Sequence, residues 1–179
     1  ACAAPGGKSA HILECEHVEL TALDHDQARL ARIASNLTRL NLHAQLIRGD
    51  AAVVAPWWDG RTYARILADV PCSASGVVRR HPDIKWLRRA RDIEGFANRQ
   101  RAILDALWPL LAADGKLVYA TCSVFREEND EQMEHFLARH RDARRLTLPA
   151  PHTQAQQIAG QILPDERHDG FFYALLQKS

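Results

Sequence analysis

Two cysteines stand in short contexts that suit covalent chemistry. Cys72 lies in the run DVPCSASG (69–76), and Cys122 lies in YATCS (119–123). Each follows a short apolar run, 64–70 and 116–120, that is typical of a buried strand. Because the carboxyl ends of parallel strands meet at one crevice of an open α/β sheet, the two thiols are expected to converge there. Such a pair suggests that one thiol acts as a nucleophile and the other supports it.

Acidic residues follow the other predicted strands and favour a nucleotide-like ligand. The chain begins with a glycine turn at 3–8, which would let a ligand approach the backbone before the next helix. Asp24 follows Gly7 by 17 residues, a spacing that suits a carboxylate on a ribose diol. Asp50, at the next strand end, could accept a hydrogen bond from an adenine amino group. Acidic residues at strand ends also serve as helix caps, so Asp24 alone does not decide the question.

Alternating strands and helices separate these candidates. Strands are predicted at 18–23, 45–48, 64–70, 116–120, 143–148 and 170–176, helices at 9–14, 26–40, 92–111 and 127–139, and a loop at 149–161. This alternation predicts an α/β fold with a mostly parallel central sheet and helices on both faces. The chain opens at what resembles the exit of a strand, so the first strand is expected to be truncated.

Composition limits the class of protein. A chain of 179 residues suits one domain, and its net charge of +1 gives no global field for polyanions. No apolar run approaches the roughly 18–20 residues of a membrane span, and no signal peptide is visible. The four cysteines lack CxxC or His/Cys metal spacing. Reduced thiols, no metal, no membrane and a cytoplasmic location are therefore expected.

Two common nucleotide-binding motifs are disfavoured. The tripeptide 7–9 imitates the end of a P-loop, but that motif needs glycine where Cys2 stands, and Pro5 has no amide hydrogen to offer a phosphate. The glycine fingerprint of NAD-binding proteins, G-x-G-x-x-G, is absent from the sequence.

The chain resembles the bacterial 16S ribosomal RNA cytosine-5 methyltransferases of the Sun (Fmu, RsmB) group. The resemblance covers nearly all 179 residues and rests on the runs CAAPGGK (2–8), DVPCSASG (69–76), RRHPDIKW (79–86), YATCS (119–123) and DGFFYA (169–174). It implies a Rossmann-like, S-adenosylmethionine-dependent methyltransferase fold. By this resemblance, residues 1–179 form one catalytic domain, without the N-terminal RNA-binding regions of the family.

The resemblance also implies roles for individual residues. Cys122 would be the nucleophile, Cys72 would assist release of the methylated product, Asp69 would contact the target cytosine, and Lys8 would lie near the active site. The residues implied to bind S-adenosylmethionine are Cys2, Ala3, Ala4, Pro5, Gly6, Gly7, Lys8, Asp24, Asp50, Ala51 and Asp69.

The residue types suit this chemistry. Carbon 5 of cytosine is a poor nucleophile, and a thiolate added to carbon 6 pushes electron density onto it. A thiolate is both strongly nucleophilic and able to leave again. Asp69 could stabilise the adduct at ring nitrogen 3, provided that burial raises its pKa enough to make it a proton donor. Lys8 could lower the pKa of a thiol if it lay nearby.

A basic stretch follows the first cysteine motif. Residues 79–91 contain six basic residues against one acidic residue, and Arg79, Arg80 and Lys85 are candidates for RNA contact. Trp86 could stack on a base, although a core position is favoured. The target cytosine must be unstacked to reach a thiol. The expected partner is RNA, namely 16S ribosomal RNA, and the chain is expected to be a monomer.

Two alternatives remain open. The chain could be a non-catalytic RNA-binding or ribosome-assembly module that kept the fold, although both thiols and Asp69 disfavour this. It could also be a DNA cytosine-5 methyltransferase, which would use Cys72 and needs no second cysteine. The strand-borne motif around Cys122 favours the RNA enzyme.

Overall fold

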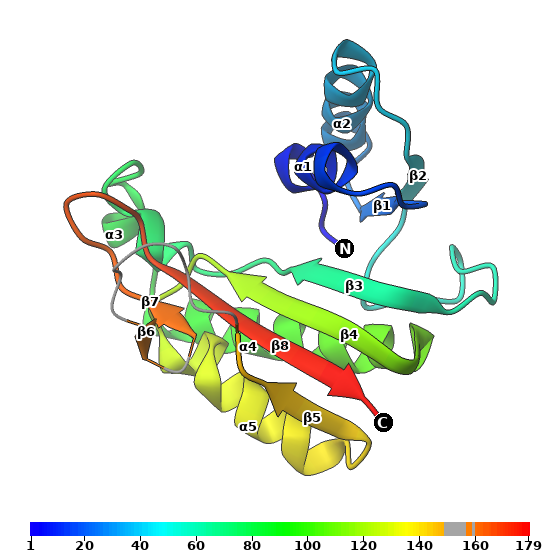
Figure 1. Cartoon of the computed structure of the whole chain (residues 1–179). Coiled ribbons are helices and arrows are strands. Elements are labelled where there is room, and N and C mark those ends of the chain that lie inside the picture. The colour runs from blue at the N-terminus through cyan, green and yellow to red at the C-terminus, as the bar shows by residue number, and fades with distance from the viewer. Residues whose placement is uncertain (149–156, 159) are drawn as a thin grey trace. The chain divides into compact units, whose positions relative to one another are not determined.

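The computed structural model describes residues 1–148, 157–158 and 160–179, and these fall into two compact units. Unit 1 is Ala1–Arg61 and unit 2 is Thr62–Ser179. Figure 1 shows the elements of both units in chain order. Over the described parts of the chain, no helix combines the length and the apolar character that crossing a membrane requires. The assignment of one catalytic domain to 1–179 stays a prediction.

Unit 1 contains a small parallel sheet and two helices. Its elements are α1 (Gly7–Cys15), β1 (Thr21–Asp24), α2 (Gln27–Arg39) and β2 (Gln45–Arg48). Strand β1 pairs with β2 in parallel, which places Asp24 opposite Arg48. Helix α2 begins at a side-chain cap, where an Asp26 carboxylate oxygen accepts from the backbone N–H of Ala28 at 2.8 Å.

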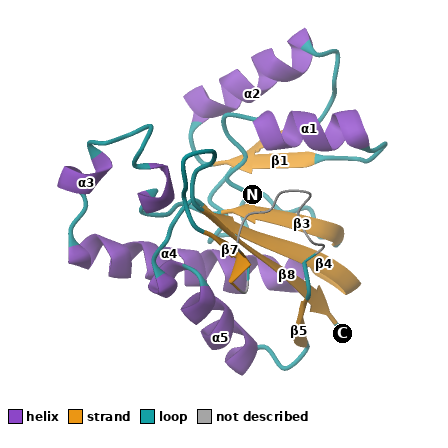
Figure 2. Ribbon diagram, turned by 60° about the vertical axis from the view of Figure 1, so that its left-hand side comes forward, coloured by secondary structure: helices purple, strands orange, loops and turns teal. Residues whose placement is uncertain are grey.

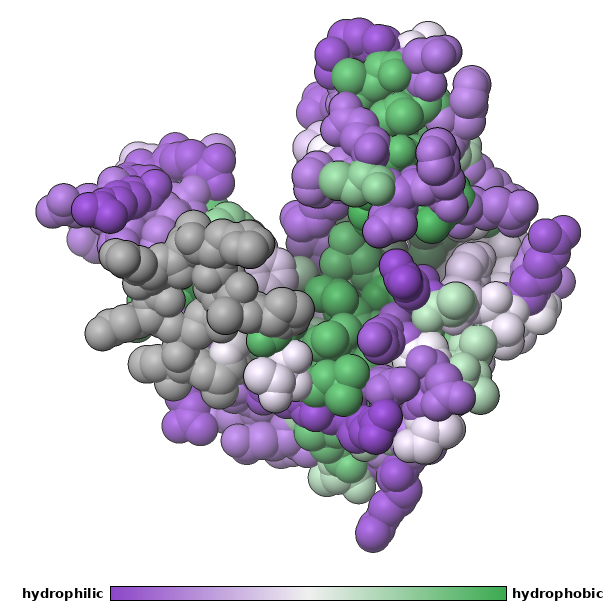
Figure 3. All heavy atoms as spheres, viewed as in Figure 1, coloured by the Kyte–Doolittle hydropathy of each residue, from purple (hydrophilic) through white to green (hydrophobic). Residues whose placement is uncertain are grey.

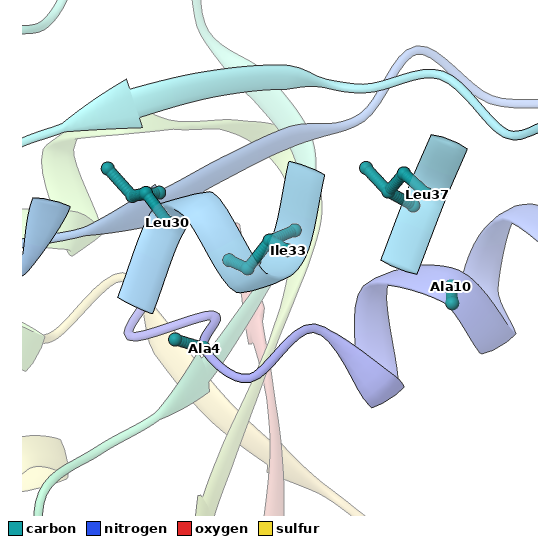
Figure 4. Packing of buried hydrophobic residues seen from close by; sticks show 5 residues of the cluster. All are labelled: Ala4, Ala10, Leu30, Ile33 and Leu37. Atoms are coloured by element: carbon teal, nitrogen blue, oxygen red, sulfur yellow. The ribbon is translucent and has the colours of Figure 1, made fainter. Parts of the chain in front are cut away.

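The core of unit 1 forms along one face of α2. Its apolar residues recur at helical spacing and are buried against the N-terminal loop and α1. Figure 4 shows this core, in which Leu30, Ile33 and Leu37 come from α2, Ala4 from the N-terminal loop and Ala10 from α1. The turn at 3–8 is therefore held in place by packing against α2, a helix that begins only at Gln27.

Unit 2 is built on a six-stranded sheet. Its strands are β3 (Tyr63–Asp69), β4 (Leu111–Thr121), β5 (Ala143–Leu146), β6 (Gln157–Ile158), β7 (Gln161–Ile162) and β8 (Phe171–Lys178). Its helices are α3 (Ile84–Leu87), α4 (Ala90–Leu107) and α5 (Asp130–Arg139), with short 3-10 turns η1 (Ser75–Val77), η2 (Trp108–Leu110) and η3 (Arg126–Glu128).

The strand order in unit 2 is β3-β4-β8-β7-β6, with β5 also pairing with β8. Strands β3 and β4 are parallel and are connected through α4, whereas the pairs formed by β5 to β8 are antiparallel. Parallel pairing thus occurs where a helix carries the chain back across the sheet, and the C-terminal strands add to its edge antiparallel. The α/β class predicted from the alternation is confirmed.

The core of unit 2 lies between the sheet and its two long helices. Figure 2 shows α4 and α5 along the same face of this sheet. The side chains packed there are almost fully buried: Ile103, Leu104, Leu117, Tyr119, Met133, Phe136, Phe172, Ala174 and Leu176. This rigid layer supports the ends of β3 and β4, from which both cysteine loops emerge.

The two largest differences from the predicted helix boundaries are the end of α4 and the start of α5. The helix predicted at 92–111 ends at Leu107, and Leu111 already begins β4. Pro109 lies in the intervening turn η2, where its missing amide hydrogen cannot continue a helix. The helix predicted at 127–139 begins at Asp130, because Glu128 lies in the turn η3 with its carboxylate buried. The predicted loop at 149–161 falls partly outside the described residues, and it is wrong for the described part, which holds β6 and the first residue of β7.

Candidate active site

The two cysteine loops of unit 2 bring their sulfur atoms into contact. Cys72 Sγ lies 3.3 Å from Cys122 Sγ, and none of the four cysteines, all of them described, is in a disulfide. The pairing of β3 with β4 places Asp69 opposite Ala120, so the loops that leave both strands start side by side. The two thiols meet at strand ends, as the sequence predicts.

Contact with the other thiol distinguishes the two cysteines. The hydrogen bond to Cys122 is the largest cause that raises the pKa of Cys72 far above its ordinary value, and burial of the thiol adds to the effect. Cys72 therefore keeps its proton and can donate it to the neighbouring sulfur. Either sulfur can donate in this contact, and the raised pKa of Cys72 favours that thiol as the donor.

Backbone contacts hold three loops of unit 2 together beside the thiols. The N–H of Gly76 donates to the carbonyl oxygen of Cys122 at 2.8 Å, and the N–H of Gly170 donates to the carbonyl oxygen of Gly76 at 2.8 Å. A Cβ at position 76 would collide with the Gly170 carbonyl, so only glycine fits there. A Cβ at Gly170 would in turn lie 3.0 Å from Gly76 Cα, so the two loops approach closely at both glycines.

Asp69 is the last residue of β3 and stands three residues before Cys72. It is half-buried, at the end of the sheet from which both thiol loops emerge. A contact between its carboxylate and a base stays a prediction.

Glu128 is a site residue that sequence reasoning missed. Its side chain is fully buried, and its carboxylate accepts from the N–H of Ser73, the hydroxyl of Ser123 and the amide of Gln100. From the sequence, it reads as one of two acidic residues at a helix start, where the helix dipole accounts for it. Nothing in the local pattern separates it from its exposed neighbour Glu127.

The predicted cofactor loop lies in unit 1 and is held from behind. The N–H of Ala4 donates to Asp24 Oδ2 at 3.1 Å, and Arg29 Nη2 donates to the carbonyl oxygen of Ala4 at 2.9 Å. Gly6 adopts a φ of 100°, and a Cβ there would lie 3.1 Å from the Ile33 side chain. At Gly7, by contrast, a Cβ would meet nothing within 4 Å. Arg29, which the sequence gave no reason to select, thus helps to shape the loop.

The predicted acidic residues of unit 1 have backbone partners. Asp24 is almost fully buried, and its Oδ1 accepts from the N–H of Asp26 at 3.1 Å. Asp50 Oδ1 accepts from the N–H of Ala52 at 2.8 Å, and Ala51 is buried. Each carboxylate oxygen that holds one backbone donor can accept a second one.

The other predicted cofactor residues also lie in unit 1. Cys2 is half-buried with a φ of 58°, Ala3 is half-buried, Pro5 is exposed, and Lys8 is exposed in the first turn of α1. Because Lys8 belongs to unit 1 and the thiol pair to unit 2, its role beside the thiols stays a prediction. Among the residues that the structure describes, no cluster of three metal-ligating side chains is present.

The basic stretch lies on the surface of unit 2. Arg80 Nη2 is 2.6 Å from Asp169 Oδ2, and Arg79 Nη2 is 3.8 Å from Asp169 Oδ1. Lys85 Nζ lies over the Trp86 ring, 5.3 Å from its centroid. Trp86 itself is 80% exposed, so the favoured core position is wrong. It lies on the four-residue helix α3, none of whose residues is buried.

Comparisons with known proteins agree with this fold. A family model described as 16S rRNA methyltransferase RsmB/F matches residues 1–177. Proteins named ribosomal RNA small subunit methyltransferase B from Shewanella oneidensis and Vibrio cholerae are 52% and 53% identical over 100% and 99% of this chain. This chain covers 42% and 40% of them, so it spans about two fifths of their length.

Two solved structures from Pyrococcus horikoshii are also similar. NSun6 with SFG has a TM-score of 0.85 and 30% identity over 98% of this chain and 46% of its own. A methyltransferase homolog protein has a TM-score of 0.82 and 26% identity over 99% of this chain and 59% of its own. The predicted methyltransferase fold is thereby confirmed. This chain belongs to the 16S rRNA methyltransferase RsmB/F family.

Proposed function

We propose that this chain is the catalytic part of an S-adenosylmethionine-dependent enzyme that methylates carbon 5 of a cytosine in 16S ribosomal RNA, in the cytoplasm. The observation that carries the proposal is the contact between Cys72 Sγ and Cys122 Sγ at the ends of two parallel strands. The membership of the RsmB/F family supports the RNA substrate. The relative solved with SFG supports a ligand in the cofactor position.

Unit 1 would hold the cofactor, which supplies the methyl group. The open side of Gly7 leaves room beside the backbone of the loop 3–8, and Asp24 and Arg29 fix that loop from behind. By family resemblance, the loop takes the methionine end, Asp24 takes the ribose hydroxyls, and Asp50 with Ala51 flanks the adenine. The open space at Gly7 supports the assignment of the loop.

Cys122 would act as the nucleophile. Its sulfur forms a bond to carbon 6 of cytosine, and the displaced electron pair makes carbon 5 nucleophilic. After carbon 5 carries its methyl group, a solvent water takes the proton of carbon 5, the electron pair of that C–H bond re-forms the double bond between carbons 5 and 6, and the bond between sulfur and carbon 6 breaks. The electron pair of that bond returns to sulfur as a thiolate and the aromatic ring is restored.

Cys72 would serve as the partner that exchanges a proton beside this sulfur. Its raised pKa keeps it a neutral thiol, so it can hydrogen-bond to the leaving thiolate. Asp69, at the end of β3, would contact the base edge at nitrogen 3. Without Cys72, the covalent adduct should form and persist.

The basic surface around α3 would contact the RNA. On the face drawn in Figure 3, the region of α3 carries mostly hydrophilic residues. Arg79, Arg80 and Lys85 supply positive charge, and the exposed ring of Trp86 offers a stacking face for an unpaired base. Arg79 and Arg80 pair with Asp169, which fixes the loop around that carboxylate. We expect the same two guanidinium groups to contact phosphate as well.

The test is adduct trapping. Cys72→Ala is incubated with S-adenosylmethionine and a 16S ribosomal RNA transcript, and the mixture is run on a denaturing gel. We expect a protein–RNA band that disappears in Cys72→Ala/Cys122→Ala. Methyl transfer that survives Cys122→Ala but not Cys72→Ala would overturn these roles in favour of the DNA-type enzyme. RNA binding with neither adduct nor transfer would favour the non-catalytic module.

A further inference from the structure

We propose that Glu128, together with Gln100, is a positioning residue that sets the separation of the two thiols. The inference rests on the proposed function only for the chemistry assigned to those thiols, because the geometry lies entirely within unit 2. Glu128 lies in η3, between β4 and α5, and its side chain is fully buried. Its contacts reach both cysteine loops at once.

One carboxylate joins the residues that follow the two cysteines. Glu128 Oε1 accepts from the backbone N–H of Ser73 at 2.8 Å, and Glu128 Oε2 accepts from the hydroxyl of Ser123 at 2.5 Å. Ser73 directly follows Cys72, and Ser123 directly follows Cys122. Hydrogen bonds to a buried carboxylate are short and strong, so each loop is tied to the same rigid group.

Gln100 completes the link from α4. Its Nε2 donates to Glu128 Oε1 at 3.0 Å and to the carbonyl oxygen of Pro71 at 2.9 Å. Both neighbours are acceptors, so the amide nitrogen must face them. Gln100 Oε1 is then left buried without a hydrogen-bond partner. An orphaned buried acceptor is unfavourable. In return, the amide nitrogen of Gln100 holds the carbonyl of Pro71, the residue just before Cys72.

Glu128 is itself held on the sheet. Tyr119 of β4 donates its hydroxyl to the Glu128 carbonyl oxygen at 2.6 Å. Between the two loops, the hydroxyls of Ser73, Ser75 and Ser123 lie 3.1–3.2 Å from one another. The residues around both sulfurs therefore belong to one hydrogen-bonded unit, which we call the Glu128 network: Ser73, Ser75, Gln100, Tyr119, Ser123 and Glu128.

The consequence is a fixed reaction geometry. A displacement of about 1 Å at reacting groups can cost about a hundredfold in rate. The Glu128 network would hold Cys72 beside Cys122 while the bond between Cys122 Sγ and carbon 6 of cytosine forms and while it breaks. Removing the charge of Glu128, or shortening its side chain, should let the Cys72 and Cys122 loops move apart.

The test measures the effective concentration of the two thiols, with no substrate present. The chain is equilibrated with reduced and oxidised glutathione. One oxidised glutathione takes two electrons from the thiol pair, which gives the Cys72–Cys122 disulfide and two reduced glutathione molecules. After an alkylating quench, peptide mass spectrometry gives the fraction that carries this disulfide. Glu128→Gln keeps the shape and removes the charge, while Glu128→Asp keeps the charge and shortens the reach.

We expect the effective concentration to fall about tenfold in both variants, because a loosened pair spends less time within reach. Glu127→Gln, at the exposed neighbour, is the matched control and should leave the value unchanged. Thermal unfolding of each variant shows whether it is folded. If the Glu128 variants fail to fold, Gln100→Met, which removes the orphaned oxygen and the link to Pro71 together, should still lower the value severalfold. An unchanged or raised value in every folded variant would overturn the proposal.

Coupling within the network provides a second measurement. Ser123→Ala removes the hydroxyl that joins the Cys122 loop to Glu128, together with its contacts to Ser73 and Ser75. Because Ser123 and Glu128 act through the same link, the effect of this substitution should not add to that of Glu128→Gln in the double variant. In the methyl-transfer assay, Glu128→Gln should lower kcat about a hundredfold with KM little changed. Failure of the unaltered chain to transfer methyl groups would count against the proposed function and would leave the glutathione result standing.

Discussion

At the scale of single residues, the contact between the thiols affects the pKa of Cys72. Cys72 has a raised pKa, chiefly through its hydrogen bond to Cys122 and secondly through burial. A raised pKa means that the neutral thiol persists to a higher pH than in an isolated cysteine. Removing Cys122 removes the main cause, so the pKa of Cys72 should then fall toward its ordinary value.

Alkylation by iodoacetamide, followed by peptide mass spectrometry across pH 6–11, measures this change. In the unaltered chain, the reaction of Cys72 should have no midpoint within that range. In Cys122→Ala, a midpoint should appear, and the modification of Cys72 at pH 9 should rise. The exposed Cys15 is the internal reference, with the same profile in both proteins. A Cys72 profile that does not respond to the substitution would contradict the assigned cause.

Trp86 was predicted to lie in the core, and the structure places it on the surface instead. Stacking of a base on an aromatic ring contributes about 1–3 kcal/mol, so Trp86→Ala should weaken binding of single-stranded RNA about fivefold to a hundredfold. Leu87→Ala is the matched control, because its side chain is 63% exposed on the same helix but has no π-face. Fluorescence anisotropy with labelled RNA compares them, and Trp86→Phe should retain part of the affinity. Equal losses in both alanine variants would argue against stacking.

At the scale of elements, glycine decides how closely two loops approach. Gly76→Ala would place a methyl group against the carbonyl oxygens of Gly170 and Cys122. The free energy of unfolding should fall by about 2 kcal/mol, as in other overpacked sites. Gly95→Ala is the control, because Gly95 lies in α4 with open space around its Cα. It should raise the free energy of unfolding by ~0.5–1 kcal/mol.

Urea unfolding measures both changes. A Gly76→Ala variant as stable as the unaltered protein would mean that the loops tolerate a wider separation. Reduced formation of the Cys72–Cys122 disulfide in this variant would further connect the glycine contact with the thiol geometry.

The elements themselves were predictable to different degrees. Strand β2 matches the predicted 45–48, and α2 agrees with 26–40 to within one residue at each end, because a period of 3.6 and an Asp26 cap mark it clearly. The start of α5 was not predictable, since two adjacent glutamates look alike in sequence. Whether Glu128 points to solvent or inward depends on donors at Ser73 and Gln100, which lie 55 and 28 residues away.

At the scale of the whole molecule, the boundary between the two compact units follows Arg61. The turn before it is exposed, with Gly60 at a φ of 92° and the Arg61 side chain 83% exposed. Exposed turns with few contacts are preferred sites of proteolysis. Brief treatment with trypsin should therefore cut first after Arg61 and give the fragments 1–61 and 62–179, identified by mass spectrometry.

Arg61→Gln is the control for this cut. It should delay the appearance of both fragments and leave later cleavage sites unchanged. A first cut inside either unit would mean that the boundary is more protected than its exposure indicates.

The sequence alone indicated the fold class through local periodicity and the family through short motifs, and it predicted the thiol chemistry that we propose, since all of these are written in neighbouring residues. The pairing of β3 with β4 explains why its two cysteine motifs meet. Only the tertiary structure decided that Trp86 is exposed, that Glu128 is buried between the two cysteine loops, and that the C-terminal strands pair antiparallel. These outcomes depend on partners far apart in the chain, because burial and hydrogen bonding are settled by what packs against a residue.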